Sequence, residues 1–184
     1  DTLFGATYMV VSPEHAMLKE WLEKGIIKNA DAVKAYQAEA ARKSDFERSE
    51  LNKEKTGVQL EGVMGINPVN DKEIPIFISD YVLSTYGTGA IMAVPGGDQR
   101  DYDFAVKFGL PVTYTVQPLP ESGDDLANYE GKAPFVSHDG IVINSAVDAT
   151  RAKGDALSLN GLRVDEAIDK VNAWLEEAGV GKGT

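Results

Sequence analysis

Four charged residues follow a Pro-Gly-Gly break near the middle of the chain: Asp98, Arg100, Asp101 and Asp103. An apolar run of strand length, Ala90 to Val94, precedes the break, and the pattern after it predicts the opening of a helix. Backbone N–H groups at a helix start attract anions, whereas carboxylates attract cations. The stretch therefore combines groups for both kinds of ligand.

Three interpretations of Asp98, Arg100 and Asp101 stay open on the residues alone. They can form a structural cap and ion pair at the helix start. Their carboxylates can hold Mg²⁺ or Ca²⁺, although Arg100 intervenes and no third cluster of oxygen ligands is evident. A desolvated aspartate can also bind a substrate ammonium group, with Met92 and Val94 lining a small pocket or belonging to the core. No Ser-His-Asp set with suggestive spacing exists, so hydrolysis would use a positioned water.

The composition is typical of one globular domain: 184 residues, 43% hydrophobic and 26% charged, with a formal net charge of -11. The acidic surface argues against broad contact with a nucleic-acid backbone but permits contact with one end of a nucleic acid. The absence of cysteine excludes disulfides and thiolate chemistry. Two histidines, His15 and His138, are too few and too separated for a metal cluster. The longest apolar runs fall short of the roughly 20 residues of a membrane span.

The hydrophobic pattern predicts a mixed α/β or α+β domain, with a barrel-like, largely antiparallel sheet core surrounded by helices. Strands are expected at 3–11, 58–63, 74–78, 90–94, 111–116 and 141–143. Helices are expected from Ser12-Pro13 to about 24, at 29–43, 101–108 and 164–178. The charged segment 43–55 is expected to be a solvated helix end or surface excursion, and 117–132 an exposed loop.

The run YGTGAIMAVPGGDQRDYDFA, from Tyr86 to Ala105, closely resembles the signature of the editing domain inserted into leucyl-tRNA synthetases. The neighbouring stretches DTLFG at 1–5, VVSPEH at 10–15, IPIF at 74–77 and GIVINS at 140–145 agree with it, so the resemblance covers nearly the whole chain. Isoleucyl- and valyl-type editing domains share Gly-Thr-Gly, but Met-Ala-Val-Pro followed by Asp-Gln-Arg-Asp resembles the leucyl pattern. The HIGH and KMSKS types of motif are absent. We therefore expect a single editing domain, residues 1–184, excised from a larger synthetase and unable to activate amino acids.

The resemblance implies post-transfer editing, the hydrolysis of the ester that joins isoleucine, methionine or norvaline to the 3′-terminal adenosine of tRNA(Leu). Water attack, helped by the substrate's ribose hydroxyl and by backbone N–H groups, would need neither metal nor cofactor. The implied partners are this aminoacyl-adenosine and the remaining domains of the parent synthetase. A cytoplasmic monomer without membrane contact is expected. The alternatives are a catalytically weak aminoacyl-adenosine binding module, an isoleucyl- or valyl-type editing domain and, more distantly, a metal-dependent phosphoesterase.

The resemblance also assigns roles to individual residues. Asp101 matches the aspartate that holds the substrate's α-ammonium group, and Thr2 matches a threonine whose bulk excludes leucine. Asp98 and Arg100 match polar positions beside the amino-acid pocket. The expected substrate-binding residues are Leu83, Tyr86 and Ile91 at the adenosine, and Met92 and Val94 at the amino acid.

Two departures from the family pattern affect these expectations. Gly97 stands where many relatives carry histidine, so a contact from that side chain is absent or is replaced by Gly97 backbone atoms. The chain as given begins after the threonine-rich stretch that usually precedes the residues matching Asp1-Thr2. Contacts from that stretch to the amino acid or the ribose are expected to be missing.

Overall fold

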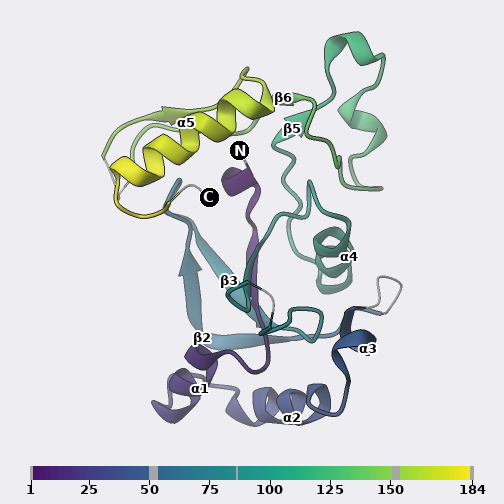
Figure 1. The fold of residues 1–184 in the computed structure, drawn as a ribbon, viewed down its shortest axis with the longest axis vertical. Coiled ribbons are helices and arrows are strands. Elements are labelled where there is room, and N and C mark those ends of the chain that lie inside the picture. Colours follow the sequence, from purple (N-terminus) through teal and green to yellow (C-terminus); the bar gives the residue numbers. More distant parts are fainter. Residues whose placement is uncertain (1, 50–53, 86, 151–153, 183–184) are drawn as a thin grey trace. The chain divides into compact units, whose positions relative to one another are not determined.

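The computed structural model describes residues 2–49, 54–85, 87–150 and 154–182, which fall into two compact units (Figure 1). The pocket unit comprises Asp1–Thr7, Ile66–Lys72 and Val94–Thr184. The sheet unit comprises Tyr8–Gly65 and Glu73–Ala93. Neither unit is a continuous stretch of sequence, because the chain passes from one to the other repeatedly.

A four-stranded sheet in the order β2-β3-β1-β4 forms the centre of the sheet unit. Its strands are β1 (Tyr8–Val11), β2 (Val58–Ile66), β3 (Glu73–Ile78) and β4 (Ala90–Ala93). β1 runs parallel to β3, with Val10 opposite Phe77, and antiparallel to β4, with Val10 opposite Ile91. Val10 is fully buried, as expected for an apolar strand with neighbours on both sides.

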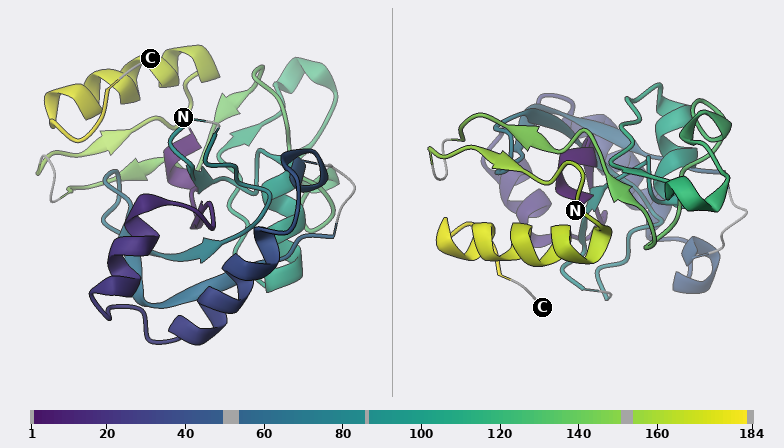
Figure 2. Two further views of the ribbon diagram at one scale, coloured as in Figure 1. Left: turned by 60° about the horizontal axis from the view of Figure 1, so that its bottom comes forward. Right: turned by 90° about the horizontal axis from the view of Figure 1, so that it is seen from above.

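Two helices, α1 (Ala16–Glu23) and α2 (Ala30–Ala40), pack beside this sheet (Figures 1 and 2). Their apolar stripes place Leu18 and Val33 in one core cluster with Leu60 of β2 and Ile78 of β3. All four side chains are at most 1% exposed. Burial of aliphatic side chains of this size stabilises the fold by about 1.5–3 kcal/mol each.

The first helix begins later than the sequence predicts. Its N-cap is His15, whose Nδ1 accepts a hydrogen bond from the N–H of Met17 at 3.2 Å. Ser12, the expected cap, donates its own N–H to the carbonyl oxygen of Gly89 at 2.7 Å. Ser12 is therefore held beside the segment that leads into β4, and the helix can begin only after the following turn.

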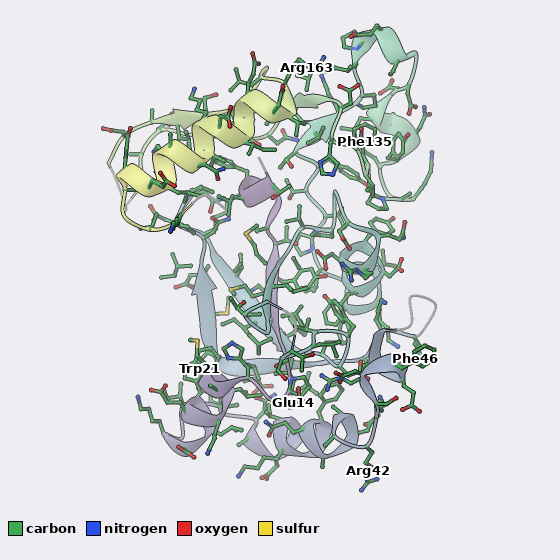
Figure 3. The ribbon with its side chains drawn as sticks, viewed as in Figure 1. Glu14, Trp21, Arg42, Phe46, Phe135 and Arg163 are labelled. Atoms are coloured by element: carbon green, nitrogen blue, oxygen red, sulfur yellow. The ribbon has the colours of Figure 1, made fainter. Side chains whose placement is uncertain are left out.

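The charged segment 43–55 is not a solvated excursion throughout, because it contains α3 (Asp45–Ser49), whose Arg48 is only 6% exposed. The Arg48 guanidinium forms a fork with the carboxylate of Glu14, with N–O distances of 2.9 and 3.2 Å. It also donates to the carbonyl oxygens of Asp80 and Val82 at 2.7 and 3.0 Å. Arg48 thus anchors this segment to the chain that follows β3. Glu14 is labelled in Figure 3.

The pocket unit is built from short strands and two longer helices. They are η1 (Thr2–Gly5), α4 (Gln99–Phe108), β5 (Val116–Gln117), η2 (Pro120–Ser122), η3 (Leu126–Asn128), β6 (Ile141–Val142), β7 (Ala146–Val147), β8 (Leu157–Ser158) and α5 (Val164–Glu177). α5 runs alongside the β7–β8 pair (Figure 2) and buries Ala167, Val171 and Trp174 in one core cluster with Leu157 of β8. This stripe confirms the predicted amphipathic helix.

The mixed α/β class is confirmed, since helices accompany both a parallel strand pair, β1–β3, and the antiparallel pairs β1–β4, β5–β6 and β7–β8. The barrel-like detail is not confirmed, because no closed barrel occurs among the described residues. The expected strand 111–116 is reduced to Val116–Gln117, which pairs with only two residues of β6. Ladders this short cannot continue around a closed barrel. No helix in the described ranges is long and apolar enough to cross a membrane.

We predict that Arg48→Met destabilises the chain, because it leaves the Glu14 carboxylate and two buried carbonyl oxygens without their donor. The expected loss in free energy of unfolding is about 2–3 kcal/mol. Because Glu14 is partly exposed, this loss is no larger than the smallest losses seen when one partner of a fully buried ion pair is removed. The matched control is Arg42→Met at an exposed arginine, labelled in Figure 3, with a change within about 0.5 kcal/mol. Urea unfolding followed by circular dichroism measures both, and equal midpoints would contradict the anchoring role.

Candidate functional site

The turn between β4 and α4 fixes the position of Asp101. The carbonyl oxygen of Val94 accepts hydrogen bonds from the N–H groups of Gly97 and Asp98 at 3.0 and 3.1 Å. The N–H of Val94 donates to Oδ2 of Asp101 at 2.9 Å. Asp101 is 7% exposed, so its carboxylate lies buried against the main chain of the turn. The strand end and the first turn of the helix therefore hold each other in place.

Asp98 is the N-cap of α4. Its Oδ1 accepts hydrogen bonds from the N–H groups of Arg100 and Asp101 at 2.8 and 3.1 Å. The Arg100 guanidinium lies 3.8 Å from Oδ2 of Asp98, and both side chains are partly exposed. Helix capping accounts for the geometry of Asp98, and the exposed ion pair contributes little to stability.

The two glycines of the turn, Gly96 and Gly97, differ in how closely other atoms approach them. A Cβ atom on Gly96 would lie 2.3 Å from the carbonyl oxygen of Thr113, whereas one on Gly97 would meet nothing closer than 4.0 Å. The carbonyl oxygen of Gly96 also accepts a hydrogen bond from the N–H of Phe135 at 2.9 Å. Phe135 is labelled in Figure 3. Gly96 is therefore required by close backbone packing, and Gly97 leaves open space.

This open space belongs to a pocket of about 320 Å³ whose lining residues all lie in the pocket unit. They are Thr2, Val94, Gly96, Gly97, Thr115, Val116, Phe135, Val136, Ser137, His138 and Ile168. Val94, Val116 and Phe135 are buried and form an apolar floor, whereas Thr2 and His138 are exposed and form part of the rim. A concave, mainly apolar surface with a few polar groups is typical of a small-ligand site.

The wall next to the floor is held by Tyr114, which precedes Thr115 and Val116. Its phenol O–H lies 2.8 Å from the carbonyl oxygen of Ala133 and 3.1 Å from that of Tyr129. Burial raises the pKa of the Tyr114 phenol above its ordinary value, so the group stays a neutral donor at physiological pH. This hydrogen bond ties the wall to the segment that leads into Phe135.

The structure brings together three of the residues expected from the sequence, since Thr2, Val94 and Gly97 line one pocket. Asp101 is not among the lining residues but is hydrogen-bonded to Val94. Leu83, Ile91 and Met92 belong to the sheet unit, where Met92 pairs with Met9 and Ile91 with Val10. Tyr86 lies outside the described residues.

Several lining residues were not singled out as site residues by the sequence, notably Phe135, Ser137, His138 and Ile168. Ile168 lies within the helix expected at 164–178, and it is 37% exposed. The segment of Phe135 carries no periodic pattern and was not assigned to an element. The folded structure places Phe135 in the pocket lining and gives it a hydrogen bond to Gly96.

No group of three or more His, Asp or Glu side chains that could hold a metal ion occurs within the described ranges. The carboxylates of Asp98 and Asp101 instead accept hydrogen bonds from backbone N–H groups. The observed arrangement can therefore bind a small, partly apolar ligand beside a buried carboxylate. Such an arrangement suits a small ligand that has an apolar part and a cationic group.

Comparison with known proteins gives a consistent result. A family model described as leucyl-tRNA synthetase, editing domain, matches residues 1–176. The leucine–tRNA ligase of Bifidobacterium adolescentis is 66% identical over 100% of this chain, which spans 20% of that relative. The leucine–tRNA ligase of Alkaliphilus oremlandii is 49% identical over 99% of the chain, which again covers 20% of the relative. The chain thus spans about a fifth of these relatives.

A solved structure is also similar to this chain. It is the crystal structure of a ternary complex of Agrobacterium radiobacter LeuRS with tRNA and LeuAMS. The TM-score is 0.52 at 35% sequence identity, over 71% of this chain and 15% of that one. The similarity therefore extends from the sequence to the arrangement of the elements.

We predict that Gly96→Ala destabilises the chain and that Gly97→Ala does not. The new methyl group at Gly96 would displace backbone atoms of Thr113, with an expected loss of about 1–3 kcal/mol in the free energy of unfolding. The same change at the adjacent Gly97 is the matched control and should stay within about 0.5 kcal/mol. Urea unfolding of both variants tests this, and similar losses at both positions would refute the assigned packing.

Proposed function

Since the chain belongs to the family of leucyl-tRNA synthetase editing domains, we propose that it hydrolyses the ester between a wrong amino acid and the 3′-terminal adenosine of tRNA(Leu). The observation that carries this proposal is the apolar-floored pocket that Thr2 lines together with Val94 and Gly97. A hydrophobic pocket separates amino acids that differ by one methylene by only about 1–3 kcal/mol. A second, hydrolytic site is therefore needed to remove the errors that the first site accepts.

The pocket would receive the amino-acid part of the substrate. Its floor of Val94, Val116 and Phe135 suits an aliphatic side chain such as that of isoleucine, methionine or norvaline. Thr2 would exclude leucine by its bulk, so that correctly charged tRNA is spared. Its position at the exposed edge of the pocket is compatible with such a gate.

Asp101 would hold the α-ammonium group of the substrate. It is a buried carboxylate next to the turn that supplies Val94 and Gly97 to the pocket. A charge-assisted hydrogen bond in such surroundings is roughly twice as strong as a neutral one. Asp98 would act by capping α4 and so positioning Asp101, with Arg100 as a further polar group beside it.

The reaction itself would be attack of a water molecule on an already activated ester. The pocket lining offers hydroxyl groups on Thr2, Thr115 and Ser137, and the substrate's own ribose hydroxyl would assist. Backbone N–H groups would stabilise the oxyanion. The scheme requires neither a metal ion nor a cofactor.

The remaining assignments follow the family pattern. Leu83, Tyr86 and Ile91 would contact the terminal adenosine, and Met92 would contribute to the amino-acid side. The other domains of a leucyl-tRNA synthetase would supply most of the tRNA contacts, since this chain has a formal net charge of -11. A cytoplasmic monomer remains the expected context.

A second function is favoured by Gly97. The missing side chain leaves open space in the pocket, which is the feature expected of a module that binds aminoacyl-adenosine with little turnover. Binding of a non-hydrolysable aminoacyl-adenosine analogue together with no measurable hydrolysis of Ile-tRNA(Leu) would favour this alternative over the deacylase.

For the role of Asp101, we predict that Asp101→Asn in the complete synthetase lowers kcat/KM for Ile-tRNA(Leu) hydrolysis about 100-fold. Asparagine keeps an oxygen for the Val94 N–H but removes the charge that holds the ammonium group. The matched control is Asp103→Asn on the same helix, where the exposed carboxylate accepts a hydrogen bond from Gln99. Unchanged deacylation by Asp101→Asn would show that Asp101 does not hold the α-ammonium group.

For the gate, we predict that Thr2→Ala allows the complete synthetase to hydrolyse Leu-tRNA(Leu) at least about tenfold faster. Thr2→Val retains the bulk without the hydroxyl and should continue to spare leucine. Release of radiolabelled leucine measures both variants. Continued sparing of leucine by Thr2→Ala would refute the gate, and release by both variants would show that the hydroxyl acts instead of the bulk.

A further inference from the structure

The segment 135–138 forms one side of the pocket and ends in a residue that the proposed function does not use. Of the residues that line the pocket, His138 is the one with a titratable side chain. It is exposed, and its imidazole makes no hydrogen bond or ion pair within the part of the chain that the structure describes. Both ring nitrogens are therefore available to a ligand.

The backbone around His138 is fixed from both sides. Before it, the N–H of Phe135 donates to the carbonyl oxygen of Gly96 at 2.9 Å. After it, the N–H of Asp139 donates to Oγ of Ser137 at 3.0 Å, and that hydroxyl donates to the carbonyl oxygen of Asp139 at 3.1 Å. The Asp139 carboxylate also pairs with the guanidinium of Arg163, which is labelled in Figure 3.

Gly140 closes this short segment tightly. A Cβ atom there would lie 2.5 Å from Cγ1 of Val116 and 2.6 Å from the carbonyl oxygen of Gln117. The path of the chain around His138 is therefore determined by close packing against β5. A side chain on a fixed backbone loses less conformational entropy when it binds a ligand than one on a free loop does.

Gly97 lines the same pocket as His138, and a Cβ atom on Gly97 would meet nothing closer than 4.0 Å, so the pocket is open at that position. Its buried part is apolar and suits the side chain of an amino acid. The polar nucleotide part of an aminoacyl-adenosine must then lie toward the exposed rim. His138 is on that rim.

We propose that His138 binds the terminal adenosine of the substrate by a hydrogen bond from its imidazole. Gly97 has no side chain that could make such a contact. This inference rests on the proposed function, because it presupposes an aminoacyl-adenosine in the pocket. His138 is a binding group here. Its loss should weaken capture of the substrate more than the rate of ester cleavage.

The test is steady-state hydrolysis of Ile-tRNA(Leu) by the complete synthetase and three variants. Loss of one hydrogen bond in His138→Ala should raise KM about three- to tenfold while kcat stays within about twofold. His138→Gln keeps a donor and an acceptor and should restore most of the binding. The double change Gly97→His with His138→Ala should also lower KM again, because Gly97 lines the same pocket and a Cβ atom there meets nothing closer than 4.0 Å.

The outcomes separate this inference from the proposed function. An active wild type with an unchanged KM in His138→Ala would overturn the inference and leave the function intact. If neither His138→Gln nor the double change restores KM, the effect is structural and the inference is equally overturned. If the wild type shows no hydrolysis, calorimetry with a non-hydrolysable norvalyl-adenosine analogue decides. Weaker binding by His138→Ala supports the inference, and equal or absent binding overturns it.

Discussion

The hydrogen bond from the N–H of Val94 to the buried carboxylate of Asp101 is the interaction on which the candidate site depends. It joins the residue after β4 to the first turn of α4, while Asp98 caps the same helix. Between these ends the chain must turn sharply, and Gly96 lets the turn approach the backbone of Thr113 without a side chain in the way. These contacts together hold the Asp101 carboxylate, Val94 and the glycine turn in place.

The pocket is a product of tertiary structure. Its lining residues come from the first turn of the chain, the turn before α4, the segment around β5, the 135–138 segment and the last helix. Thr2 and Ile168 are far apart in sequence yet line the same surface. Short strands suffice for this arrangement because Tyr114, Phe135 and Asp139 add hydrogen bonds or ion pairs between segments that have little regular structure.

The sequence predicted the helices and strand ends that depend mainly on neighbouring residues. The helix expected at 164–178 is found as α5, and the strand before the Pro-Gly-Gly break is found as β4. Burial of Arg48 was missed because its partners, Glu14 and Asp80, lie more than thirty residues away. The first helix begins after His15 and not at Ser12 for the same reason, because the N–H of Ser12 donates to the carbonyl oxygen of Gly89 in a distant segment. His138 and Ile168 could not be assigned to the pocket without the fold.

The proposed function places the amino-acid part of an aminoacyl-adenosine in the pocket lined by Thr2, Val94 and Gly97. The most direct measurement is a crystal structure of the chain with a non-hydrolysable norvalyl-adenosine analogue. The norvaline side chain is expected on the floor formed by Val94, Val116 and Phe135, with the ammonium group of the analogue at Asp101. An analogue bound elsewhere, with this pocket still empty, would contradict this expectation.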